Sequence, residues 1–157
     1  MVRLADLPEW EREHMLDKIP TLPDFGLSPW VQGPPLAQRR VALITTAGLH
    51  RRNDRPFGSG GRDDYRVIPG DTEAANLIMS QYSVNFDRTG FQQDINVVFP
   101  LDRLNELARD GVIGSVAAYH YAFMGAGSPV TRLEPKAREV AKLLKQDAVD
   151  AVLLTPV

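Results

Sequence analysis

The sequence contains no cysteine among its 157 residues. This absence excludes a disulfide, a thiolate nucleophile and a cysteine-based zinc site within the chain. Net charge is also small, at -2, whereas nucleic-acid-binding proteins carry a basic excess or stripe. The longest apolar runs are too short to span a bilayer, and the N-terminal residues lack the apolar segment of a signal peptide. We therefore expect a cytoplasmic protein that binds neither membranes nor nucleic acid.

Histidine and phosphate-binding motifs are scarce as well. His14, His50 and His120 stand in no ligand spacing of the His-Glu-x-x-His kind, so no metal site is expected. The glycine cluster Gly58–Gly61 follows no clear strand and opens no helix. It therefore does not predict a dinucleotide site.

The composition is that of an ordinary globular domain, with 43% apolar and 24% charged residues. We expect two parts, residues 1–39 and residues 40–157. Pro8–Ile19 has the pattern of a short helix, with acidic residues near its start. Pro20–Pro35 contains five prolines and two large aromatic residues, which predicts an extended arm packed on its own domain or on a second subunit.

Strands alternating with amphipathic helices predict an α/β fold for residues 40–157, with a mostly parallel sheet flanked by helices in a Rossmann-like or flavodoxin-like layering. The predicted strands cover residues 40–46, 65–68, 116–123 and 150–157, and the predicted helices cover residues 101–110 and 134–146. The first and last strands are continuous apolar runs, which is typical of parallel strands buried on both faces. The last one stops at the edge where α/β sheets bind ligands, so we expect an incomplete domain.

One polar stretch, Ser83–Asp94, lies between the apolar runs Leu77–Met79 and Ile95–Phe99. A polar segment between buried elements is where a binding site is usually built. The alternative is a solvated surface loop.

Several segments together resemble the selenoprotein B subunits of the glycine/sarcosine/betaine reductase and D-proline reductase family. They are Val41–Leu49, Asp64–Pro69, Ser83–Asp94, Val98–Leu104, Gly111–Gly114 and Val149–Val157, so the resemblance covers residues 40–157. One departure is Ala47, which precedes Gly48 where the family has a second glycine.

The resemblance implies reductive cleavage of a substrate bond by a selenolate, with a disulfide or selenenyl-sulfide as the oxidised form. In the family, the strand matching Val149–Val157 runs directly into a selenocysteine-containing redox motif. We therefore expect selenocysteine directly after Val157, encoded by a codon otherwise read as stop. This chain alone holds no cofactor and is expected to be inactive. The resemblance also implies a partner subunit that carries a pyruvoyl group.

A chalcogenolate at this position needs a cation or donor, a proton source and polar groups that orient the substrate. The candidate substrate-binding residues are Thr45, Thr46, Asn85, Asp87, Arg88 and Thr155. Arg88 is the candidate holder of a substrate carboxylate, and His120 is the candidate general acid. The alternatives are a structural ion pair between Arg88 and Asp87, a core histidine at position 120, and threonines that only cap the strand.

The loop from His50 to Arg55 is rich in arginine and could receive a phosphate or carboxylate, or be a solvated surface. Two other interpretations of the whole chain stay open. One is a small-molecule or partner-binding module without catalysis. The other is a structural homo-oligomer in which the Pro20–Pro35 arm wraps around a neighbour.

Overall fold

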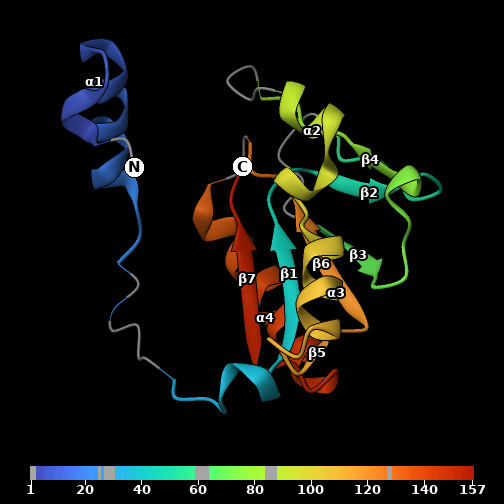
Figure 1. Cartoon of the computed structure of the whole chain (residues 1–157). Helices are drawn as coiled ribbons and strands as arrows, with labels where there is room; N and C mark the ends of the chain where they lie inside the picture. The colour runs from blue at the N-terminus through green and yellow to red at the C-terminus, as the bar shows by residue number, and fades with distance from the viewer. Residues whose placement is uncertain (1–2, 25, 27–30, 59–63, 84–87, 127–128) are drawn as a thin grey trace. The chain divides into compact units, whose positions relative to one another are not determined.

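The computed structural model describes residues 3–24, 26, 31–58, 64–83, 88–126 and 129–157. The chain divides into two compact units, Met1–Trp30 and Val31–Val157 (Figure 1). The first unit holds α1 (Glu9–Lys18) between the short helices η1 (Leu4–Asp6) and η2 (Ile19–Thr21), and no residue of these three elements is buried. α1 matches the helix expected over residues 8–19.

A mixed, mostly parallel, curled sheet forms the centre of the second unit (Figure 1). The chain enters it through η3 (Leu36–Gln38), and β1 (Arg40–Thr45) pairs in parallel with β7 (Ala151–Thr155) along its length. β1 also pairs in parallel with β5 (Ser115–Val116) at its start and with β6 (Tyr119–Phe123) at its end. β3 (Tyr65–Pro69) runs antiparallel to β6. The single strand expected over 116–123 is thus divided into two.

Helices cover the two faces of this sheet. α3 (Leu101–Arg109) places Leu101 and Leu104 in one core cluster with Val41 and Leu43 of β1. α4 (Val130–Gln146) places its buried residues in a second cluster with Ala42 of β1. Successive residues of β1 therefore point into different cores, which explains the continuous apolar run in its sequence. α4 begins four residues before the helix predicted over 134–146, with Pro135 inside it.

The last strand differs from expectation. β7 was expected to be buried on both faces, but Val152, Leu153 and Leu154 are 39%, 42% and 65% exposed. The physical reason is its place in the sheet, because in the described residues β7 pairs with β1 alone. The apolar run therefore predicted the strand correctly, but the prediction that the strand is buried was wrong.

A small second sheet pairs β2 (Leu49–Arg51) antiparallel with β4 (Leu77–Met79). The sequence around β2 was expected to be an irregular polar loop, yet Leu49 and His50 are buried. Within Ser83–Asp94, the described residues include the short helix α2 (Thr89–Gln93), where only a loop was expected. The remaining elements are η4 (Ala74–Asn76) and η5 (Ile95–Val97).

An ion pair ties the end of α4 to the break between β5 and β6. Arg40 pairs with the carboxylate of Asp147 and donates from Nε to its backbone oxygen. The same carboxylate accepts hydrogen bonds from the backbone N–H groups of Ala118 and Tyr119, at 2.8 and 3.3 Å. Burial raises the pKa of Asp147, but Arg40 and these N–H groups outweigh it, so the pKa lies below its ordinary value.

Among the described residues, the longest helices are too short or too polar to cross a bilayer.

Candidate functional site

The carboxyl ends of the parallel strands β1, β6 and β7 meet at one edge of the sheet. Thr46, just past β1, donates its N–H to the carbonyl of Thr155 at 3.3 Å. On the β6 side, Gly125 donates its N–H to the carbonyl of Thr46 at 2.8 Å. Thr46 therefore lies between the ends of two neighbouring strands, at the edge where open α/β sheets bind ligands.

Thr46 holds Val157 at this edge. Its hydroxyl accepts a hydrogen bond from the N–H of Val157 at 2.8 Å and donates one to the carbonyl of Val157 at 3.2 Å. Gly125 closes the other side, because an added Cβ there would lie 2.7 Å from the Val157 oxygen and 3.0 Å from Cβ of Thr46. The 2.7 Å contact is closer than real Cβ atoms come and the 3.0 Å contact is tight, so the glycine is what allows Val157 to lie here.

The other two candidate threonines tie the strand ends to one another. Thr45 is fully buried, donates to the carbonyl of Thr155 at 3.3 Å and accepts from the N–H of Ala47 at 3.1 Å. The hydroxyl of Thr155 donates to the carbonyl of Val98 at 2.9 Å, which joins β7 to the residue that follows η5. These hydroxyls therefore use backbone partners and shape the edge.

Gln81 forms the next part of the wall, and sequence reasoning missed it. It is 6% exposed and donates from Nε2 to the carbonyl of Thr46 at 3.3 Å. Its side-chain oxygen accepts from the N–H of Ser83 at 3.1 Å. Its place two residues after the apolar run Leu77–Met79 was the only available signal.

Arg88 lies at the start of α2 and joins this wall. Its guanidinium donates from one terminal nitrogen to the carbonyls of Gln81 and Ser83, at 2.7 and 3.3 Å. A series of hydrogen bonds therefore connects Arg88 through Gln81 and Thr46 to Val157. Asn85 and Asp87, the other candidates of this segment, lie outside the described residues.

His120 lies in the core beside β1. Its Nδ1 accepts a hydrogen bond from the N–H of Leu43 at 3.0 Å, and its ring meets Phe99 edge-on. Burial is the main cause that lowers the pKa of His120 to about 4. The imidazole is therefore neutral at pH 7 and carries its proton on Nε2, which has no partner in the described structure.

His50 is the second buried histidine, and its hydrogen bonds define its tautomer. Nδ1 lies 2.8 Å from the carbonyl of Arg51, which can only accept, so Nδ1 carries the proton. The other ring nitrogen, Nε2, lies 2.7 Å from the hydroxyl of Ser80 and accepts its hydrogen bond when the ring is neutral. In the described part of the chain, no three histidine or acidic side chains are grouped as metal ligands.

The fold and this geometry define an α/β protein with a polar candidate site at the carboxyl edge of its parallel strands. The family model for glycine/sarcosine/betaine reductase selenoprotein B (GRDB) matches residues 31–157, and the chain belongs to this family. The resemblance stated from the sequence motifs is thereby confirmed.

Curated relatives agree with this assignment. The chain is 38% identical over 121 residues to the D-proline reductase subunit gamma of Acetoanaerobium sticklandii, covering 76% of this chain and 49% of that protein. It is 34% identical over 140 residues to the glycine reductase complex component B subunit gamma of Symbiobacterium thermophilum, covering 85% and 32%. The corresponding Peptoclostridium acidaminophilum subunit is 40% identical over 123 residues, covering 76% and 28%.

The chain thus spans about half the length of the D-proline reductase subunit and about a third of these glycine reductase subunits. No solved structure matches the chain.

Proposed function

We propose that this chain is part of a selenoprotein B-type reductase and that the edge around Thr46 and Val157 positions its reacting chalcogen. The observation that carries the proposal is the pair of hydrogen bonds by which Thr46 holds Val157 at the carboxyl ends of the strands. Family membership supports the reaction class. The 157 residues contain no cysteine. The redox residue in this proposal is the selenocysteine that the family resemblance leads us to expect after Val157.

In this proposal, the selenolate and a thiol deliver two electrons to the substrate bond and are left as a selenenyl-sulfide. The strand ends of this chain contribute by holding the reacting atom in place. Two hydrogen bonds fix the backbone of the residue before the chalcogen, and the missing side chain of Gly125 leaves the space that Val157 occupies. Such preorganisation lowers the barrier because the reacting atom does not have to be ordered during the reaction.

The substrate class in this proposal is a small carboxylate. The relatives are named as reductases of D-proline, glycine, sarcosine and betaine, all of which carry a carboxylate. Arg88 is the proposed carboxylate-binding residue, because its planar fork suits that group and the Gln81 connection places it at the edge. The remaining proposed lining residues are Thr45, Thr46, Asn85, Asp87 and Thr155.

His120 is the proposed proton donor only if a path from Nε2 to the substrate opens in the complete site. Its burial and its hydrogen bond to Leu43 favour the other interpretation, a neutral core histidine that accepts a backbone N–H of β1. Replacing it separates the two roles, since a core residue changes stability whereas a proton donor also changes the pH dependence of turnover.

The test uses the gene as it continues past the Val157 codon, expressed with its partner subunits in a host that inserts selenocysteine. Thr46→Val removes both hydrogen bonds to Val157 and keeps the side-chain shape. Turnover of glycine, sarcosine, betaine or D-proline should fall at least about tenfold, the effect of a reacting group displaced by a fraction of an ångström. Thr131→Val, at an exposed position of α4, is the matched control.

Equal turnover of the Thr46→Val and Thr131→Val enzymes would contradict the proposed role of the edge. Absence of turnover in the unsubstituted enzyme with every one of the four substrates would contradict the reductase function itself.

Four further parts of the proposal concern the fold, the partners and the location of the protein. The helices on both faces of the sheet support a Rossmann-like or flavodoxin-like layering. A pyruvoyl-bearing partner subunit would hold the substrate amine, and the Pro20–Pro35 arm would contact a neighbouring subunit. A cytoplasmic location fits a selenolate, which needs reducing surroundings.

A further inference from the structure

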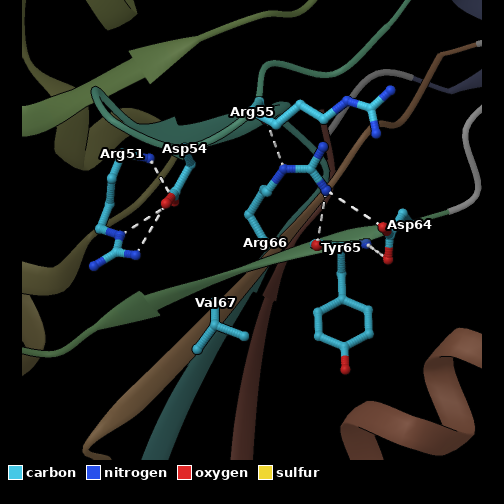
Figure 2. A pocket seen from close by; sticks show the side chains of 7 residues that line it. All are labelled: Arg51, Asp54, Arg55, Asp64, Tyr65, Arg66 and Val67. Carbon is cyan, nitrogen blue, oxygen red and sulfur yellow. Dashed lines mark hydrogen bonds and ion pairs between the residues drawn. The ribbon is translucent and has the colours of Figure 1, made fainter.

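Three arginines surround a hollow of about 320 Å³ at the corner between β2 and β3. Figure 2 shows this hollow, whose lining residues are Arg51, Asp54, Arg55, Asp64, Tyr65, Arg66 and Val67. Arg51 and Arg55 belong to the cationic loop noted in the sequence. Arg66, from β3, is the member that the sequence pattern did not suggest.

Arg66 is held in one orientation. Its Nε donates to the carbonyl of Arg55 at 2.8 Å, and its terminal nitrogens donate to the carbonyls of Tyr65 and Pro56 at 2.9 and 3.4 Å. The guanidinium carbon lies 4.4 Å above the ring of Phe57. A guanidinium has five N–H donors, so two remain after these contacts. Arg66 therefore presents a preoriented cation.

The charge of Arg66 is only weakly countered. Its ion-pair partner Asp64 lies at 3.7 Å and is 57% exposed. Arg51 is neutralised by Asp54 through two hydrogen bonds of 2.9 and 3.1 Å, and Asp54 has a lowered pKa chiefly because of that contact. For Arg55, the described residues supply neither an ion pair nor a side-chain hydrogen bond. Three arginines against two aspartates leave one positive charge in excess, and it belongs to Arg55, beside the weakly paired Arg66.

This hollow lies at the same edge of the sheet as Thr46 and Val157. Arg66 pairs with Ala122 of β6, Ala122 with Thr45 of β1, and Thr45 with Thr155 of β7. Directly paired residues point to the same face, so these four side chains form one row. With strands about 4.8 Å apart, the backbones of Arg66 and Thr155 are roughly 14 Å from each other.

We propose that Arg55 and Arg66 form a binding site for an oxyanion, the carboxylate or phosphate group of a small molecule that binds along this edge. Arg66 supplies a fixed cation with two N–H groups that make no hydrogen bond, and Arg55 supplies a second guanidinium without an ion pair among the described residues (Figure 2). Two such forks are the arrangement that recognises planar carboxylates and phosphates. The site differs from the Arg88 site and does not depend on the reductase proposal.

The test is a titration of the 157-residue protein, with the arginine Nε–H signals followed by NMR. Inorganic phosphate and sodium acetate are added separately, and sodium chloride keeps the ionic strength constant. Saturable shifts at Arg55 and Arg66 are expected with at least one of the two anions. A stronger response to phosphate identifies a phosphate ligand, and an equal or stronger response to acetate identifies a carboxylate.

Arg55→Gln should weaken the binding about tenfold, since it removes one of two charge-assisted contacts without touching the hydrogen bonds of Arg66. Arg109→Gln, at an exposed position of α3, is the matched control and should bind as the unsubstituted protein does. Equal affinity in Arg55→Gln, or no saturable shift with either anion, would overturn the proposal.

Discussion

Acid should destabilise this protein through His120. The side chain is fully buried, its Nδ1 accepts a hydrogen bond from the N–H of Leu43, and burial lowers its pKa from the ordinary 6.5 to about 4. The unfolded chain therefore binds the proton more readily than the folded chain. The stability that neutral His120 contributes is fully present above pH 6.5 and is lost as the pH falls through 6.5 towards 4. A difference of about 2.5 pKa units corresponds to about 3 kcal/mol.

The assay is urea unfolding followed by circular dichroism between pH 7 and pH 4.5. His120→Asn removes the titration and keeps an acceptor near Leu43, because the asparagine oxygen can occupy the position of Nδ1. The variant should be less stable at pH 7, through lost packing against Phe99, and should lose less stability on acidification. His14→Asn, at an exposed position of α1, is the control for removing a histidine.

Parallel stability curves for the unsubstituted protein and His120→Asn would refute this reasoning. The charged groups that act on His120, Asp147 and Arg40, are present in both proteins, so they cannot produce the expected divergence.

Four more substitutions, in three comparisons, test the fold. Asp147→Asn should lower the free energy of unfolding in urea by about 1–3 kcal/mol, because it weakens a charge-assisted hydrogen bond to Arg40. This loss should become smaller below pH 4, where the carboxylate of the unsubstituted protein becomes protonated. The same loss at every pH would contradict the assigned ion pair. Gly125→Ala should lower the stability measured by thermal unfolding by about 1–3 kcal/mol, since the new methyl group would lie 2.7 Å from the Val157 oxygen. An unaltered melting temperature would show that Val157 is not held there. Leu43→Ala should lower the free energy of unfolding by about 2–5 kcal/mol and Leu154→Ala by far less, because Leu43 is fully buried and Leu154 is 65% exposed. Similar losses in urea unfolding would contradict the exposure of β7.

The sequence predicted the α/β class because β1, α3 and α4 have patterns that depend on their own residues. β1 is a continuous aliphatic run between two cores, and both helices carry one apolar face. Strand partners could not be predicted in this way. The antiparallel direction of β3 and the break between β5 and β6 depend on tertiary packing rather than on local pattern.

The candidate site was predicted in part. Thr45, Thr46 and Thr155 were identifiable because they end apolar strands, and parallel strands end at one edge. The role of Gln81 could not be predicted, since it depends on the pairing of β2 with β4, which brings Gln81 to the carbonyl of Thr46. Arg66 was missed for a similar reason, because only the antiparallel pairing of β3 with β6 places it at this edge.

The most direct test of the central claim is mass spectrometry of the protein purified from its native host. Trypsin cleaves after Lys145, and the sequence from Gln146 to Val157 contains no further lysine or arginine. The tryptic peptide that begins at Gln146 should continue past Val157 into a selenium-containing residue, recognisable by its isotope pattern. A peptide that ends at Val157, or that continues there with a residue bearing neither selenium nor a thiol, would contradict the proposal that this edge positions the reacting chalcogen.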